Sequence, residues 1–130
     1  MQNVKVIQSP AGNVGYLQFN SHIAIAQPQL IAAVELFAQQ NVSELVVDLR
    51  YNGGGLLALA SQFAYMVSGD SIIQQRFFEQ TQFNDKYPNT NAVTGDALQP
   101  MPFYSLEIDY QQGRFTSNSL PSLLLNRVFV

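Results

Sequence analysis

The pattern of apolar and polar positions predicts alternating strands and helices in the first half of the chain. Residues 14–19 (VGYLQF) are β-branched and aromatic and follow a turn signal at residues 11–13, which is typical of a strand. Residues 28–41 repeat their apolar positions with helical spacing. Residues 44–49 (ELVVDL) are a nearly unbroken apolar run, which suits a parallel strand covered on both faces. This order of strand, helix and strand predicts a βαβ unit.

The middle of the chain is less regular. A second helix is predicted from Leu56, because apolar residues recur at helical spacing, and Gly69 is expected to end it. Residues 71–80 (SIIQQRFFEQ) predict a further strand that is partly exposed. Residues 81–102 contain three prolines and little periodicity, which predicts a long excursion or flap.

The last part of the chain predicts two more strands. Residues 103–110 (FYSLEIDY) alternate, a turn follows at residues 111–113, and residues 127–130 (RVFV) resemble the start of a buried strand. No repeat and no second domain is recognisable in the 130 residues. We therefore expect a single α/β domain, residues 1–130, with a mainly parallel sheet and an irregular flap or hairpin.

Composition excludes several classes of function. The net charge is −3 with only two lysines, so no basic stripe is available and nucleic acid is not an expected partner. There is no cysteine and one histidine, so we expect no disulfide, no metal site and no cofactor. No apolar run approaches the ~20 residues of a membrane-spanning helix, so we expect no membrane insertion.

Three consecutive glycines, residues 53–55, stand between the second predicted strand and the second predicted helix. They could serve only the geometry of a tight turn. Gly53, Gly55 and Ala58 also satisfy the G-x-G-x-x-[GA] fingerprint of dinucleotide sites, although that turn normally follows the first strand of its fold. A third interpretation is an oxyanion hole, in which backbone N–H groups at the start of a helix bind a developing negative charge.

The residues around the glycines carry a family resemblance. Residues 48–55 (DLRYNGGG) resemble the D-L-R-x-N-x-G-G signature of the tail-specific, or carboxyl-terminal processing, serine peptidases. The likeness covers most of residues 14–67 and, more loosely, residues 120–130. It implies part of a ClpP/crotonase-like α/β core that cleaves peptide or protein substrates with a serine nucleophile and a lysine base. A periplasmic or cell-envelope location is implied by the resemblance alone.

The resemblance also implies roles for individual residues. One oxyanion donor corresponds to the backbone amide of Gly54 or Gly55, and we expect at least one of these amides to be unpaired and to face a cleft. The rest of the signature is expected to fix the turn through hydrogen bonds; these residues are Asp48, Arg50, Asn52 and Gly53.

The nucleophile and the base are not expected within this sequence. The family's serine follows a strand like RVFV and its lysine lies further on, whereas Lys5 and Lys86 are in other places. We therefore expect the N-terminal part of a catalytic core, without the PDZ module that often precedes it, and inactive by itself. The alternative is a peptide-binding or interaction module of the same fold. An interior strand left exposed at residues 127–130, together with the flap, predicts self-association.

Other polar and aromatic residues receive structural interpretations. His22 is expected to be an ordinary histidine at a strand end, because no motif places a nucleophile beside it. Four acids are interpreted as solvated: Asp85, Asp96, Glu107 and Asp109. Four aromatic residues are expected to pack in the core or the flap: Phe77, Phe78, Phe83 and Tyr87.

Overall fold

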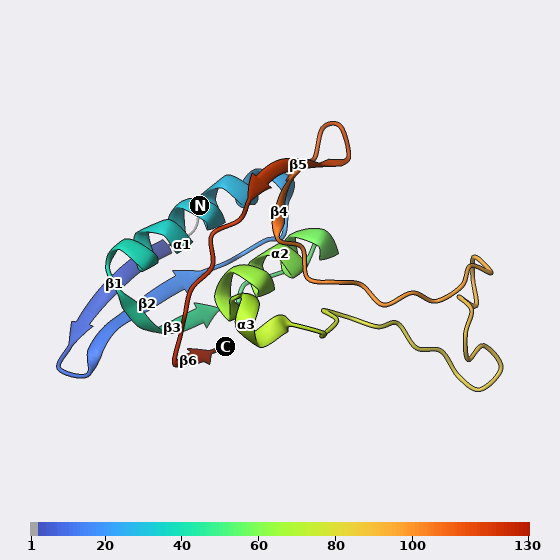
Figure 1. Cartoon of the computed structure of the whole chain (residues 1–130), viewed down its shortest axis with the longest axis horizontal. Helices are drawn as coiled ribbons and strands as arrows, with labels where there is room; N and C mark the ends of the chain where they lie inside the picture. The colour runs from blue at the N-terminus through green and yellow to red at the C-terminus, as the bar shows by residue number, and fades with distance from the viewer. Residues whose placement is uncertain (1–2) are drawn as a thin grey trace.

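The computed structural model describes residues 3–130 and centres on a four-stranded mixed sheet (Figure 1). Its strands are β1 (Asn3–Ser9), β2 (Gly12–Gln18), β3 (Val42–Asp48) and β6 (Arg127–Phe129), in the spatial order β1-β2-β3-β6. β1 runs antiparallel to β2, whereas β2, β3 and β6 run parallel to one another. The predicted α/β class with a mainly parallel sheet is confirmed.

Two helices follow β2 and β3. α1 (Gln27–Gln39) comes after a short 3-10 helix, η1 (Ala24–Ala26), and Pro28 stands in its first turn, where the missing N–H costs no hydrogen bond. α2 (Leu57–Ser68) ends at Gly69, whose φ of 72° suits glycine. β2, α1 and β3 form the predicted βαβ unit.

The hydrophobic core lies between these helices and one face of the sheet. Leu17 and Leu45 are fully buried on that face, and Gly15 leaves room for Phe37 of α1, whose ring would lie 3.1 Å from a Cβ at Gly15. Burying each large apolar side chain contributes roughly 1.5–3 kcal/mol. Val46, which points to the other face of β3, is only half-buried. The expectation that β3 is covered on both faces is therefore wrong.

A second, two-stranded sheet is attached to the helices by buried polar side chains. β4 (Leu106–Asp109) and β5 (Arg114–Ser119) form an antiparallel hairpin. The fully buried Gln62 donates to the carbonyl oxygen of Leu106 at 2.7 Å and accepts from the hydroxyl of Tyr110 at 3.0 Å. Burial raises the pKa of Tyr110 to about 12. These hydrogen bonds make the burial of an amide tolerable.

The strand predicted at residues 71–80 is wrong. The chain instead forms α3 (Asp70–Ile73), and Gln75 then takes a positive φ of 61°. Only a single bridge, between Glu79 and Met101, pairs this segment with another. Its composition suits a strand, but a strand also needs a neighbour along its length, and composition does not provide one.

Two of the strands were not predicted from the sequence, and a third lies at an exposed edge. β1 was not predicted, although Val4 and Val6 alternate toward the core, and the polar β5 was not predicted either. β6 pairs with β3 as a strand, but it lies at the edge of the sheet, with Val128 40% and Phe129 47% exposed. This exposure agrees with the expectation that residues 127–130 are left exposed in this chain, because β3 is the only strand that pairs with β6 among the described residues.

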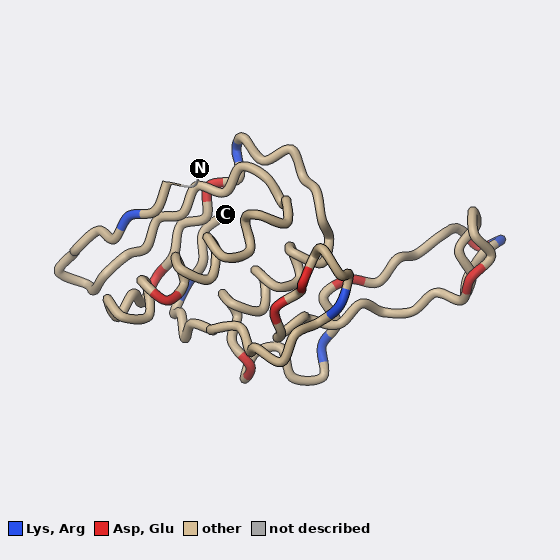
Figure 2. The backbone as a smooth tube through the Cα atoms, turned by 90° about the horizontal axis from the view of Figure 1, so that it is seen from above, with Lys and Arg blue, Asp and Glu red and all other residues tan. Residues whose placement is uncertain are grey.

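Residues 81–102, called the arm below, project away from the rest of the molecule (Figure 1). Figure 2 shows charges of both signs near the tip of the arm. Asp85 and Asp96 are exposed there as expected, whereas Glu107 and Asp109 on β4 are half-buried. Phe78 packs edge-on against Phe103 beside the base of the arm, and three other aromatic side chains are exposed: Phe77, Phe83 and Tyr87. Within residues 3–130, no helix has the length and apolar character needed to cross a membrane.

Candidate functional site

The connection from β3 to α2, residues 49–56, is held by the side chain of Asn52. Its Oδ1 accepts the N–H of Gly54 at 2.8 Å, and its Nδ2 donates to the carbonyl oxygen of Phe19 at 2.7 Å. Its own backbone N–H donates to the carbonyl oxygen of Leu49 at 2.8 Å. One amide side chain therefore ties the glycine turn to the residue that follows β2.

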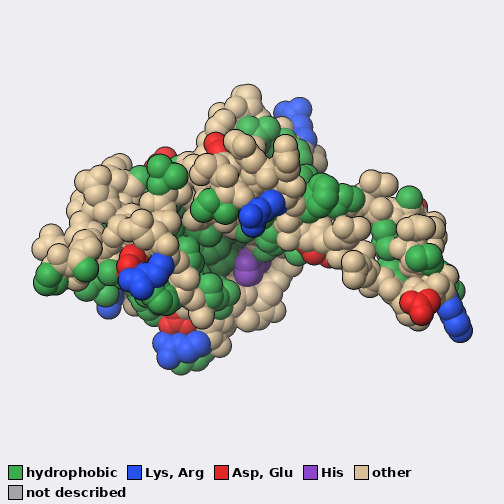
Figure 3. Space-filling model, turned by 60° about the horizontal axis from the view of Figure 1, so that its bottom comes forward, with side chains coloured by type: hydrophobic (Ala, Val, Ile, Leu, Met, Phe, Trp, Pro, Cys, Tyr) green, Lys and Arg blue, Asp and Glu red, His purple; other side chains and the backbone are tan. Residues whose placement is uncertain are grey.

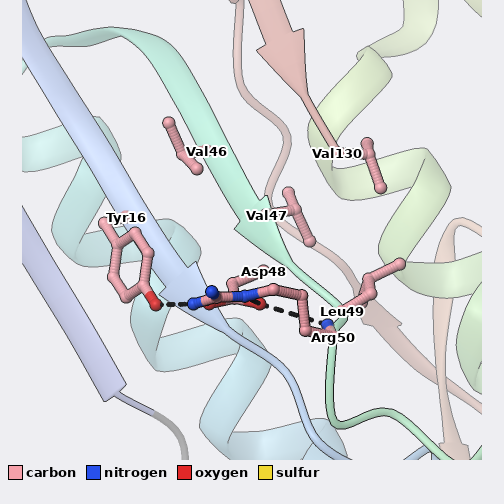
Figure 4. A pocket seen from close by; sticks show the side chains of 7 residues that line it. All are labelled: Tyr16, Val46, Val47, Asp48, Leu49, Arg50 and Val130. Carbon is pink, nitrogen blue, oxygen red and sulfur yellow. Dashed lines mark hydrogen bonds and ion pairs between the residues drawn. The ribbon is translucent and has the colours of Figure 1, made fainter.

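The exit of β3 is held by an ion pair. Arg50 donates from Nη2 and Nε to the two oxygens of Asp48 at 2.7 and 3.0 Å, and the Tyr16 hydroxyl donates to Oδ2 at 2.7 Å (Figure 4). The hydrogen bonds from Arg50, together with that from Tyr16, hold the pKa of the Asp48 carboxyl well below its usual range. The hydrogen bond to Asp48 in turn raises the pKa of the Tyr16 hydroxyl. The carboxylate form of Asp48 therefore stabilises the point where the strand ends.

A pocket of about 450 Å³ opens beside this ion pair. The close-up shows the side chains that line it, which come from β2, β3, the start of the glycine turn and the end of the chain (Figure 4). They are Tyr16, Val46, Val47, Asp48, Leu49, Arg50 and Val130. The three glycines do not line this pocket.

Two of the glycines are required by the backbone itself. Gly54 has a φ of 88° and Gly55 a φ of 136°, which other residues rarely adopt. At Gly55 there is also no space, because a Cβ would lie 2.3 Å from the carbonyl oxygen of His22. Nothing lies within 4 Å of a Cβ at Gly54. The turn thus combines positive φ angles at Gly54 and Gly55 with a very close approach of the Gly55 backbone to that of His22.

The two candidate amides differ in their hydrogen bonds. The N–H of Gly54 is occupied by Asn52, as described above. The N–H of Gly55 has no acceptor among residues 3–130, and Gly55 is exposed. α2 begins two residues later, at Leu57. The turn therefore presents the N–H of Gly55 as a free backbone donor close to the N-terminal end of a helix, where negative charge is favoured.

Two residues that contact this turn were not predicted to do so. His22 lies 3.1 Å from Asn52, between its Nδ1 and the Oδ1 of the amide, and Phe19 packs against the histidine ring with 4.3 Å between ring centroids. Both follow β2, which is parallel to β3. Because the carboxyl ends of parallel strands meet at one sheet edge, the residues that follow β2 are the sequence signal for partners of the signature.

Other candidate groups do not gather at the turn. Lys5 lies on β1 and Lys86 in the arm, and neither forms a hydrogen bond to the glycine turn. Within the part of the chain that the structure describes, no three acidic or histidine side chains come together in a way that could hold a metal ion.

Comparisons with known proteins identify the family. A family model described as peptidase family S41 matches residues 13–117, which include both the turn and the arm. The chain belongs to peptidase family S41. No curated protein sequence matches it significantly. This family membership agrees with the resemblance carried by residues 48–55 and disfavours the dinucleotide interpretation of the glycines.

A solved structure of an S41 relative has the same fold. It is a Bacteroides fragilis protein assigned to the S41 proteases, which superposes with a TM-score of 0.67 at 25% sequence identity. The match covers 97% of this S41 chain and 30% of the Bacteroides chain. The present chain therefore spans less than a third of the length of that relative.

Proposed function

We propose that this S41 chain takes part in peptide-bond cleavage by tail-specific, serine-type chemistry, and that its glycine turn supplies one donor of an oxyanion hole. The observation that carries the proposal is the N–H of the exposed residue Gly55, which has no acceptor among residues 3–130. Such a donor can bind the oxygen that becomes negative when a peptide carbonyl is attacked. Loss of one donor of this kind typically lowers turnover ~10²-fold or more.

The assignment favours Gly55 over Gly54. The Gly54 amide would have to leave the Oδ1 of Asn52, 2.8 Å away, before it could bind a substrate oxygen. The Gly55 amide has no such bond to break, and it lies next to the positive end of the α2 dipole. A donor that is already oriented needs no reorganisation during the reaction, which is what makes such groups effective.

We assign neither the nucleophile nor the base to residues 3–130. Neither a serine nor a lysine side chain within that range is bonded to the turn. The isolated chain is therefore expected to hydrolyse no peptide and to react with no serine-directed phosphonate, because an oxyanion donor alone forms no acyl-enzyme. Covalent labelling of one particular serine would contradict this.

The experiment uses the chain itself and a product-like ligand. A peptide with a free C-terminal carboxylate places a negative oxygen where the oxyanion would form, and the same peptide with an amidated terminus does not. We expect the ¹H–¹⁵N resonance of Gly55 to shift with the acid and to stay in place with the amide. The alternative, a peptide-binding module without chemistry, predicts that both peptides shift the same resonances and leave Gly55 unchanged.

We also propose that the isolated chain self-associates through β6 or the arm. Val128 is 40% exposed and Val130 88% exposed at a sheet edge whose backbone groups can pair with another strand. The arm adds exposed apolar side chains, including Val93 at 88%. Light scattering at high micromolar concentration tests this directly. A monomer throughout that range would contradict the proposal.

A further inference from the structure

His22 holds the glycine turn at three points. Its backbone N–H donates to the carbonyl oxygen of Gly54 at 3.0 Å, and its carbonyl oxygen accepts the N–H of Leu56 at 2.7 Å. Its side-chain Nδ1 lies 3.1 Å from the Oδ1 of Asn52. The residue thus bonds before, within and after the glycines, and its carbonyl is the group that excludes a side chain at Gly55.

The hydrogen bonds of Asn52 determine which way the histidine bond runs. Nδ2 of Asn52 faces the carbonyl oxygen of Phe19, which only accepts, so the opposite atom of the amide is the oxygen. That oxygen already accepts the N–H of Gly54. It has no proton to give, so Nδ1 of His22 must be the donor. In the neutral ring, Nε2 then carries a lone pair.

The imidazole ring of His22 is also held in place by packing against an aromatic side chain. The fully buried Phe19 contacts it at 4.3 Å between centroids, and Phe19 in turn packs edge-on against Phe63 of α2 at 5.5 Å. Nε2 has no hydrogen-bond partner among residues 3–130. Figure 3 shows the histidine at the bottom of a hollow that is bordered by hydrophobic side chains.

We propose that His22 is a positioning residue of the oxyanion turn. Its protonated Nδ1 fixes the side chain of Asn52, Asn52 occupies the amide of Gly54, and the amide of Gly55 is left as the free donor. The free Gly55 amide matters only if it binds an oxyanion, so the inference rests on the function proposed above. It replaces the expectation that His22 is an ordinary histidine at a strand end.

The first test determines which ring nitrogen carries the proton. A long-range ¹H–¹⁵N spectrum of the imidazole, recorded at about pH 8 where a histidine ring is usually neutral, distinguishes the two forms. We expect the proton on Nδ1, the form that is less common for free histidine. A proton on Nε2 would overturn the inference, because Nδ1 would then have nothing to donate to Asn52.

The second test removes and restores the donor. His22→Phe keeps an aromatic ring against Phe19 but has no N–H, whereas His22→Asn carries an N–H at the same δ position as Nδ1. In His22→Phe we expect the Gly54 amide proton to exchange about 10-fold faster and its resonance to shift. In His22→Asn both should return toward the values of the unmodified chain. Ile23→Ala, at the exposed neighbouring position, is the matched control and should leave Gly54 unchanged.

The outcomes separate this inference from the function on which it rests. A merely structural role for His22 predicts lower thermal stability in both variants and no difference between them at Gly54, and that result would overturn the positioning role. None of these measurements requires peptide binding or activity. A chain that passes them but shows no response of Gly55 to a peptide carboxylate would retain the positioning role and lose the oxyanion assignment.

Discussion

The glycine turn and the arm are both irregular connections, but they are built in opposite ways. The turn, residues 49–56, is bonded to residues far away in the sequence, through Asn52 to Phe19 and through Gly54 and Leu56 to His22. The arm is bonded mainly to itself, for example from Asn91 to Asp96. Irregular backbone is therefore specified by long-range partners in the turn and by local hydrogen bonds in the arm.

Substitution of Gly55 should have the largest effect on the stability of the chain. Gly55→Ala places a Cβ against the backbone carbonyl of His22, which cannot move as a side chain could, and we expect a loss of about 3 kcal/mol or more of unfolding free energy. Gly54→Ala is the control in the same turn, since its φ is also positive but its space is open. It should cost about 1–2 kcal/mol. Equal losses in urea unfolding would show that space at Gly55 is not the constraint.

The ion pair at the start of the turn should make the stability of the chain depend on acid. The pKa of Asp48 is lowered by Arg50, so its contribution is present above the ordinary value of 3.8 and is lost as the pH falls below it. Asp48→Asn should be less stable at neutral pH and should lack this acid-dependent loss. Asp96→Asn in the arm, where the carboxylate is exposed, should behave like the unmodified chain. Thermal unfolding between about pH 2 and pH 6 distinguishes the two variants.

Removal of most of the arm, residues 82–99, should have the smallest effect on stability. Glu79 and Met101 are bridged at its base, so a short Gly-Ser link can replace residues 82–99. We expect the free energy of unfolding to change by no more than about 1 kcal/mol, because the core residues lie elsewhere. A cooperative transition that disappears on this deletion would show that the arm is part of the core after all.

The difference between the two connections also explains what could be predicted from sequence. The βαβ unit was predictable because apolar periodicity is local, and residues 48–55 were recognisable as a signature. The partners of the turn were not, because His22 and Phe19 are about thirty positions away and only the parallel pairing of β2 with β3 brings them close. The strand expected at residues 71–80 failed for the same reason, since its apolar composition gave no information about a neighbouring strand.

The family could also be predicted from the sequence, whereas the choice between the amides of Gly54 and Gly55 could not. Gly54 and Gly55 are identical as letters, and they differ only because Gly54 bonds to Asn52 and Gly55 faces His22. That distinction depends on three-dimensional contacts on both sides of the turn. It determines which of the two amides is free to bind a substrate oxygen.

Amide hydrogen exchange at the two glycines distinguishes a bonded amide from a free one. In a ¹⁵N-labelled sample of the chain, both resonances are followed under identical conditions, so the solvent and the fold are the same for each. We predict that Gly54 exchanges at least about 10-fold more slowly than Gly55, whose rate should approach that of an unstructured peptide. Equal rates, or a Gly55 amide that is the more protected of the two, would contradict a turn that keeps one donor bonded and the other free.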